Sequence, residues 1–298
     1  MARARANGIE IEWDARGPED GPAMLLIMGL GGQLTRWSDE LMDALAGHGF
    51  RAIRYDNRDV GLSTKLDAAG VPDLARMGLQ LMTGGKPDAP YTLDDMATDA
   101  VGLLDALGIG RAHVVGASMG GMIAQLVAAT WPERVLSLTS VMSTTGNPAL
   151  PRATAAANAV LMMRPGGTDL DSLVAHGVRA AKVIGSPGYP VDDALLATRI
   201  RADLQRQNHP QGFARQMAAI WADGDRRPRL RTITAPTLVI HGTDDPLVPV
   251  EGGRDTAASI PGARLVEMPG MGHDLPPQLI GRIVDLIAEH AEAAGVPA

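Results

Sequence analysis

Apolar and polar residues follow two rhythms along the chain. Short apolar runs are separated by longer segments in which apolar positions recur every three to four residues. The short runs predict seven strands, at 9–13, 23–28, 51–55, 113–115, 135–142, 236–241 and 263–268. Several of these runs are continuously apolar, which is typical of strands buried on both faces of a parallel sheet.

The longer segments predict helices. The clearest is 93–107, where an apolar stripe with helical spacing ends before Gly108, a residue that commonly stops a helix. Two further helices are predicted at 119–131, which ends before Pro132, and at 281–293. Because strands and helices alternate, we expect βαβ units and an α/β fold with a mostly parallel central sheet flanked by helices.

Two segments interrupt this alternation. Residues 148–231 carry no strand signal and are predicted to form several helices, inserted into the sheet domain as a helical cap. The core domain then comprises 1–147 and 232–298. The second segment, 66–90, holds glycines and prolines but also apolar residues. It is compatible with part of a lid or with a surface helix, and the sequence leaves both open.

The composition argues against several classes of function. The 298 residues carry a net charge of −7, whereas proteins that bind nucleic acid usually present a basic face. The absence of cysteine excludes disulfides, thiolate catalysis and cysteine-ligated metals. No apolar stretch approaches the roughly 20 residues of a membrane-spanning helix, and no signal peptide is recognised. We therefore expect a cytoplasmic protein without stable membrane insertion.

The strongest chemical signal is the pentapeptide Gly116-Ala117-Ser118-Met119-Gly120. It follows a predicted strand and precedes a predicted helix, which is the strand–turn–helix context of a nucleophile elbow. Its glycines leave room where a Cβ atom would collide with a neighbouring element. Ser118 is therefore predicted to be a nucleophile at the carboxyl edge of the sheet, at the start of a helix whose dipole favours developing negative charge.

A serine nucleophile needs a base within hydrogen-bond reach and a carboxylate that orients the base. Downstream of Ser118, Asp245 and His273 each occupy a loop that directly follows a predicted strand. Since the carboxyl ends of parallel strands meet at one edge of a sheet, the three residues are predicted to form a catalytic triad. The other six histidines fall in helical segments, at strand ends or in the cap, where structural roles are expected.

Asp244 and Asp245 are neighbours in the same turn, so either carboxylate is a candidate for the triad. Pro246 and Pro249 stiffen the chain that follows Asp245. Asp245 is therefore predicted to orient the histidine, and Asp244 to be an exposed turn residue.

An oxyanion hole needs two backbone N–H donors. One is predicted to come from Met119, the residue after the nucleophile, and the other from Leu30 in the glycine-rich loop 28–32. A plain turn between a strand and a helix is the alternative for this loop. It lacks the Gly-Lys-Ser/Thr signature of a phosphate loop, and residues 33–35 break the dinucleotide-binding spacing. We predict no cofactor and no metal.

An apolar substrate pocket is predicted around these loops. Its proposed lining comprises Gly29, Met142 and Met271 beside the catalytic loops, and Met162, Met163, Met217 and Trp221 in the cap. Methionine side chains adapt to varied shapes, so we expect an apolar acyl or aromatic substrate. Ordinary core packing is the alternative interpretation of each methionine.

With these residues assembled, the chain resembles the α/β-hydrolase family over nearly its whole length. The family's three landmarks match segments 116–120, 242–245 and 270–273. Segment 55–63 resembles the family's D-x-R-G-x-G-x-S loop, with Asp59 where glycine is usual. Met28-Gly29 stands where many members carry His-Gly, a departure shared by sequences similar to aclacinomycin methylesterase. The chain thus resembles the serine carboxylesterases of that group.

The resemblance implies a serine hydrolase that cleaves short to medium acyl esters, or apolar and aromatic esters, through an acyl-enzyme. Cofactor-free haloperoxidase or perhydrolase activity, and carbon–carbon or amide hydrolysis, are alternatives on the same triad. A non-catalytic ligand-binding receptor on this fold is the alternative from another class. The expected partner is a small apolar ester, and the sequence leaves open whether the chain is a monomer or a dimer.

Overall fold

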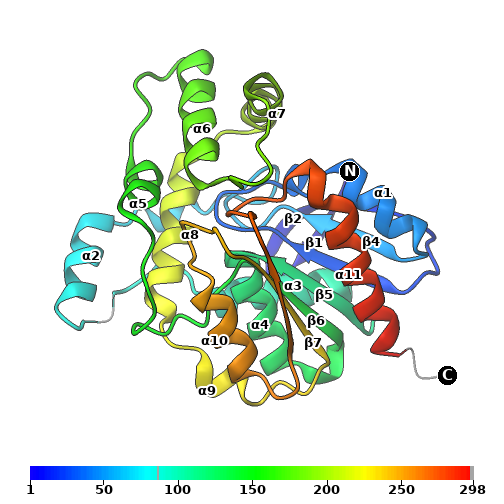
Figure 1. Cartoon of the computed structure of the whole chain (residues 1–298). Coiled ribbons are helices and arrows are strands. Elements are labelled where there is room, and N and C mark those ends of the chain that lie inside the picture. Colours follow the sequence, from blue (N-terminus) through cyan, green and yellow to red (C-terminus); the bar gives the residue numbers. More distant parts are fainter. Residues whose placement is uncertain (86, 296–298) are drawn as a thin grey trace.

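One eight-stranded sheet forms the centre of the protein (Figure 1). The computed structural model describes residues 1–85 and 87–295. The strands are β1 (Ala2–Ala6), β2 (Ile9–Arg16), β3 (Ala23–Ile27), β4 (Arg51–Tyr55), β5 (Ala112–Ala117), β6 (Val135–Val141), β7 (Thr237–Gly242) and β8 (Arg264–Met268). Their order in the sheet is β1-β2-β4-β3-β5-β6-β7-β8. The pairs β1–β2 and β2–β4 are antiparallel and the others parallel, which confirms the predicted mostly parallel sheet.

Helices cover both faces of this sheet. On one face, α3 (Leu93–Ala106) and α4 (Met119–Thr130) share an apolar core with β3, β4 and β5. On the other, α1 (Asp39–Gly47) and α11 (Ile280–Ala293) close a second core. A further helix, α10 (Glu251–Ser259), packs against β7. Because both faces are covered, β3, β5 and β7 are buried along their whole length, as their continuous apolar runs predicted.

All seven predicted strands are present, with boundaries shifted by up to three residues. The prediction omitted β1, α1 and α10. The β1 sequence alternates Ala with Arg, so it carries little apolar signal, and Ala6 is its only buried residue. It is an edge strand that pairs with β2 in the register Ala2 to Trp13. Short 3-10 turns lie at Leu34–Arg36, Asp67–Ala69, Pro132–Arg134 and Pro277–Leu279.

Five helices lie between β6 and β7, inside the segment predicted to form a cap. They are α5 (Ala155–Met162), α6 (Leu170–Ile184), α7 (Asp193–Arg206), α8 (Pro210–Asp223) and α9 (Arg227–Leu230). In Figure 1, α6 and α7 rise together above the edge of the sheet, while α8 runs down toward α9. Because α9 packs against α4 and α10, the last helix of this segment belongs spatially to the core. The domain boundary at residue 231 stays a prediction.

The 66–90 segment contains a helix, α2 (Leu74–Met82), which packs against α8 of the cap. Met77 is its buried residue, whereas the side chains of Leu79 and Met82 are exposed. Of the two interpretations left open for this segment, a surface helix is present. A lid function stays a prediction.

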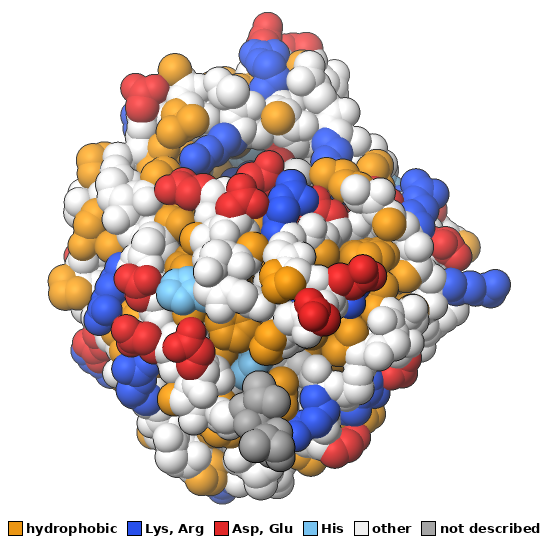
Figure 2. Space-filling model, turned by 90° about the vertical axis from the view of Figure 1, so that its right-hand side faces the viewer, with side chains coloured by type: hydrophobic (Ala, Val, Ile, Leu, Met, Phe, Trp, Pro, Cys, Tyr) orange, Lys and Arg blue, Asp and Glu red, His pale blue; other side chains and the backbone are white. Residues whose placement is uncertain are grey.

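Charges of both signs are mixed with apolar side chains on the face shown in Figure 2. Across residues 1–85 and 87–295, no helix combines the length and the apolar character that crossing a membrane requires.

Candidate active site

Ser118 sits in the sharp turn between β5 and α4. Its backbone adopts φ 56° and ψ −121°, a left-handed conformation that non-glycine residues rarely occupy. The Ser118 N–H donates to the Val141 carbonyl at 2.9 Å, and the Ser143 hydroxyl donates to the Ser118 carbonyl at 2.8 Å. Such strain persists only where neighbouring structure over-determines it, and it gathers at functional sites.

Three glycines allow the elements around Ser118 to approach each other closely. A Cβ atom on Gly116 would lie 2.1 Å from the Gly120 carbonyl oxygen, and one on Gly120 would lie 2.0 Å from the Ile27 oxygen. On the facing loop, a Cβ on Gly29 would come within 3.0 Å of the Ser118 Cβ. The glycine-rich loop after β3 therefore lies directly against the nucleophile turn.

His273 connects Ser118 to Asp245. Its Nε2 is 2.9 Å from the Ser118 Oγ, and its Nδ1 is 2.6 Å from the Asp245 Oδ2. The second carboxylate oxygen of Asp245 accepts the backbone N–H groups of Leu247 and Val248, at 2.9 and 2.8 Å. Since a carboxylate only accepts, Nδ1 carries the proton and Nε2 is free to accept the serine hydroxyl proton. A hydroxyl, an imidazole and a carboxylate thus stand within hydrogen-bond reach of one another, which is the geometry that a serine nucleophile requires.

The structure separates the two neighbouring aspartates. Asp244 is exposed and accepts the Thr243 hydroxyl at 2.6 Å and the Gly270 N–H at 2.9 Å. These hydrogen bonds, that from Thr243 foremost, lower the pKa of the Asp244 carboxyl. Asp245 is 5% exposed and is the aspartate that bonds to His273. Of the two, therefore, Asp245 stands where an orienting carboxylate must be.

His241, at the end of β7, supports the Asp245 turn. Its Nε2 donates to the Val248 carbonyl at 2.8 Å and lies 3.7 Å from the Asp245 Oδ2. Burial lowers the pKa of His241, which keeps the imidazole neutral. From the sequence, His241 was expected to have a structural role that was not specified further. Its place just before the Gly242 turn was the signal that could have identified it.

Four hydrogen bonds join the histidine loop, residues 269–274, to the cap. The His273 N–H donates to the Ile184 carbonyl at 2.7 Å, and the Gly188 N–H donates to the Gly270 carbonyl at 2.9 Å. The Ser186 hydroxyl accepts the Gly272 N–H at 2.9 Å and donates to the Asp274 carboxylate. Burial raises the pKa of that carboxyl. The sequence contains no signal that joins these distant segments.

The two predicted oxyanion donors come from different segments, Met119 from the residue after Ser118 and Leu30 from the loop that lies against the nucleophile turn. Met119 is the first residue of α4, where a helical N–H has no intrahelical acceptor. Among the described residues the Leu30 N–H likewise has no acceptor, whereas the next N–H, that of Gly31, donates to the Gln216 side chain at 2.8 Å. Of these two N–H groups, therefore, that of Leu30 is available to an oxyanion and that of Gly31 is not.

The proposed pocket residues divide by exposure. Met142, Met217 and Met271 are buried, and Trp221 is partly buried with its ring facing Gly78 of α2. Met162 and Met163, at the end of α5, are 44% and 51% exposed. These two face solvent, so they are the least enclosed members of the set. A role in substrate binding stays a prediction for all of them.

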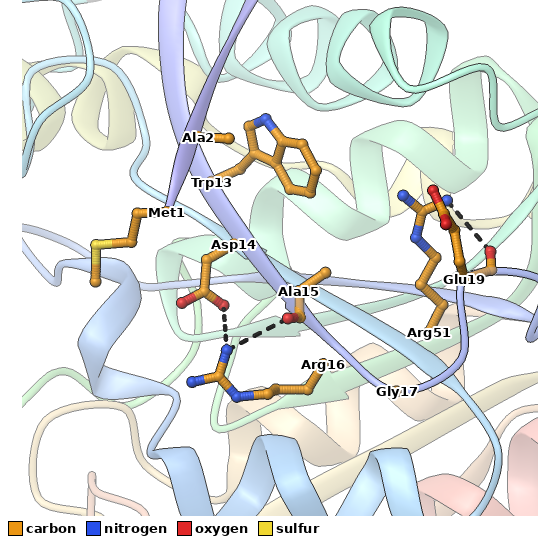
Figure 3. Close-up of a pocket in the computed structure, with 9 residues that line it drawn as sticks. All are labelled: Met1, Ala2, Trp13, Asp14, Ala15, Arg16, Gly17, Glu19 and Arg51. Carbon is orange, nitrogen blue, oxygen red and sulfur yellow. Dashed lines mark hydrogen bonds and ion pairs between the residues drawn. The ribbon is translucent and has the colours of Figure 1, made fainter.

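A separate hollow lies at the antiparallel edge of the sheet (Figure 3). It is lined by Met1, Ala2, Trp13, Asp14, Ala15, Arg16, Gly17, Glu19 and Arg51. Figure 3 shows that Arg16 turns to Asp14 and Ala15, and that Arg51 turns to the Glu19 backbone. This lining contains no serine, threonine or histidine side chain, so it offers no second group of the kind formed by Ser118, His273 and Asp245. In the described part of the chain, no cluster of His, Asp or Glu has the arrangement of a metal site.

Comparisons with known proteins identify the family and the fold. A family model described as alpha/beta hydrolase fold matches residues 22–277. Rhodomycin D methylesterase DauP of Streptomyces sp. (strain C5) is 32% identical over 94% of this chain and 93% of its own length. Its counterpart DnrP of Streptomyces peucetius is 30% identical with the same coverage. The enol-lactonase of Burkholderia xenovorans LB400 shares the fold, with a TM-score of 0.73 and 24% identity over 98% of this chain and 100% of that one.

Proposed function

The chain belongs to the α/β-hydrolase family, and we propose that it is a hydrolase of carboxylic esters that acts through Ser118, His273 and Asp245. The observation that carries the proposal is the position of His273, bonded to the serine hydroxyl on one side and to a buried carboxylate on the other. This is the arrangement that activates a serine at neutral pH.

In the first half of the reaction, Ser118 Oγ attacks the ester carbonyl carbon while His273 Nε2 takes the hydroxyl proton. Asp245 holds the Nδ1 proton and stabilises the imidazolium that forms. The N–H groups of Leu30 and Met119 bind the negatively charged oxygen of the tetrahedral intermediate. The carbon–oxygen bond to the alcohol then breaks, and His273 protonates the leaving oxygen.

In the second half, a water molecule attacks the acyl-enzyme while His273 removes its proton. The second tetrahedral intermediate collapses, the acid leaves, and the proton returns from His273 to Ser118 Oγ. No cofactor is needed, because every proton and electron pair in the cycle is supplied by the triad, the ester and water.

For the substrate, we propose a small molecule, an ester of an apolar aromatic acid with a small alcohol such as methanol. Support comes from the relatives named as rhodomycin D methylesterases, which are similar to this chain along most of its length. Support also comes from the apolar residues Leu30, Met119 and Met142 around the nucleophile turn. Apolar surface of this kind favours neutral, hydrophobic ligands.

The test is hydrolysis of p-nitrophenyl esters from acetate to palmitate and of methyl esters of aromatic acids, with Ser118→Ala as the control. We expect turnover by the wild-type enzyme and a fall of about 10^6-fold in the variant, as in a comparable triad. Near wild-type activity in Ser118→Ala would disprove the assignment of the nucleophile.

The alternatives on the same triad give distinct results. Peroxide-dependent bromination of a phenolic dye that exceeds ester turnover would favour a haloperoxidase or perhydrolase. Hydrolysis of a carbon–carbon bond next to a carbonyl group, in place of esters, would favour a carbon–carbon hydrolase. Hydrolysis of amides in place of esters would favour an amidase. Tight ligand binding without turnover of any substrate would favour a receptor.

A further inference from the structure

Two consecutive side chains of α8, Arg215 and Gln216, are fully buried at the boundary between the cap and the core. Buried Arg and Gln side chains are uncommon unless every polar group is paired. Both of these reach the loop after β4, residues 56–63, and one of them also reaches the glycine-rich loop at 28–32. The helix thus bridges two core loops beside the nucleophile.

Arg215 forms a bidentate ion pair with Asp59. Its Nε is 2.8 Å from Oδ2, and its Nη2 is 2.7 Å from Oδ1. Although burial acts in the opposite direction, the guanidinium lowers the pKa of the Asp59 carboxyl. Gly212 adds backbone packing, because a Cβ there would lie 2.1 Å from the Asp59 carbonyl oxygen. Asp59 adopts φ +70°, at the position where the resembling motif has glycine.

Gln216 is bonded at both ends of its amide. Its Oε1 accepts the Gly31 N–H at 2.8 Å, and its Nε2 donates to the Arg58 carbonyl at 2.9 Å. The two partners fix the orientation of the amide, since the flipped group would set donor against donor and acceptor against acceptor. The side chain is therefore a rigid brace between the Arg58 backbone and the glycine-rich loop.

The other end of the glycine-rich loop is held by the same core segment. The Asn57 side chain donates to the Met28 carbonyl at 2.9 Å, and the Asp56 carboxylate accepts the Leu34 N–H at 2.8 Å. Leu30 thus lies between a fixed carbonyl at Met28 and an occupied N–H at Gly31. Its own N–H remains without an acceptor in the described residues.

We propose that Gln216 is a positioning residue for the oxyanion hole: it holds Gly31 so that the Leu30 N–H stays directed at the reacting oxygen, and the Arg215–Asp59 pair holds Gln216 in place. This proposal rests on the function proposed above. Preorganised donors act only if they need no rearrangement when charge develops, so a brace on this loop acts on the transition state rather than on substrate binding.

The test is Gln216→Met, which keeps the length of the side chain but removes both hydrogen bonds. Loss of one oxyanion donor costs about 10²–10³ in kcat, and a misdirected donor loses part of that, so we expect kcat to fall about 10- to 100-fold with KM within about twofold. Inhibition by phenylboronic acid, which forms a tetrahedral adduct on serine, should weaken by a similar factor.

The matched control is Gln125→Met. Gln125 is another fully buried glutamine, located on α4 and bonded to Ser140 and Arg226. It should lower the Tm to a similar degree but leave kcat and boronate affinity within about twofold. Equal losses of kcat in both variants would reduce Gln216 to a structural role and overturn the proposal.

If Gln216→Met does not fold, Asp59→Asn tests the same arrangement, because it weakens the ion pair that holds α8 and leaves a retained Gln216 side chain less firmly placed. We expect a smaller fall in kcat, with KM again unchanged, and unchanged kcat would overturn the proposal. The proposed function fails separately, if the wild-type protein neither hydrolyses esters nor binds phenylboronic acid. If the wild-type protein hydrolyses esters and Gln216→Met keeps the wild-type kcat, only the positioning role is disproved.

Discussion

The nucleophile elbow, residues 116–120, and the histidine loop, residues 269–274, contribute the two partners of one hydrogen bond but are held differently. The elbow is fixed by the sheet core, through glycines packed against backbone and a bond from Ser118 to β6. The histidine loop lies under the cap, which supplies hydrogen bonds to Gly270, Gly272 and His273.

The two parts of the site therefore depend on different regions of the molecule: the nucleophile turn on the core, and the histidine loop also on the cap. The contacts that hold the Ser118 turn all come from core strands and loops. The position of Ser118 should therefore change only if the core itself is disturbed. The geometry of His273 also depends on residues 184–188 of the cap. A displacement of the cap is therefore expected to misplace the base while leaving the nucleophile in position.

The largest effect should come from placing a side chain inside the elbow. In Gly120→Ala, the new Cβ would lie 2.0 Å from the Ile27 carbonyl, so strand and helix must separate. We expect a loss of more than about 4 kcal/mol of stability, or no folded protein, measured by thermal and urea unfolding. Gly281→Ala on α11, where nothing lies within 4 Å, is the control and should be neutral or mildly stabilising. A Gly120 variant of normal Tm would contradict the packing argument.

The next effect concerns the carboxylate behind the histidine loop. Asp245→Asn removes the charge that stabilises the imidazolium and favours the wrong histidine tautomer, so kcat should fall about 10^4-fold, as in a comparable triad. Asp244→Asn, one residue away and exposed, should change kcat by less than about fivefold. Steady-state kinetics of both variants on one ester decides it, and equal losses would undo the assignment of Asp245.

Acid should lower the free energy of unfolding through a buried histidine on β5, the strand that leads into the elbow. His113 on β5 is buried, lies 2.8 Å from the Ser137 hydroxyl and packs edge-on against Phe50. Burial lowers the pKa of His113 from 6.5 to about 4. The unfolded chain therefore takes up the proton first, so the stabilisation is complete above pH 6.5 and is lost as the pH falls toward about 4, by at most about 3 kcal/mol.

The measurement is Tm against pH from 7.5 to 4 for the wild-type protein and His113→Gln. The variant should be less stable at neutral pH but should lose less stability on acidification, so the two curves converge at low pH. Parallel curves would show that His113 does not contribute to the acid sensitivity. Burial also lowers the pKa of His241 and His290, so part of the slope should remain in the variant.

The smallest effect tests the contact between the cap and the histidine loop. Ser186→Ala leaves the Gly272 N–H without its acceptor, at a cost of roughly 1 kcal/mol, which corresponds to about a 3- to 10-fold fall in kcat if the loop becomes less ordered. Ser172→Ala, which removes a hydroxyl that donates to the Asp169 carboxylate at the exposed start of α6, is the control and should leave kcat unchanged. Equal kcat in both variants would mean that the cap does not order His273.

Neighbouring residues in the sequence were enough to predict the buried strands, the turn around Ser118 and the loops that carry Asp245 and His273. Continuous apolar runs required strands buried on both faces, and the strand–turn–helix around Ser118 required glycines at 116 and 120. The turn with Asp245 and the loop with His273 were each recognisable because they follow strands of a parallel sheet, whose ends converge on one edge. These predictions needed only neighbours in the chain and the alternation of strands and helices.

The contacts between the cap and the loops of the candidate site, in contrast, could be identified only in the folded structure. Gln216 meets Gly31 across 185 residues, and Ser186 meets Gly272 across 86. No periodicity or spacing encodes such pairs, because each depends on how the cap helices sit on the core. The prolines at 246 and 249 favoured Asp245 over Asp244 in the sequence, but the separate partners of the two carboxylates, His273 for Asp245 and Gly270 for Asp244, appear only once the turn is folded.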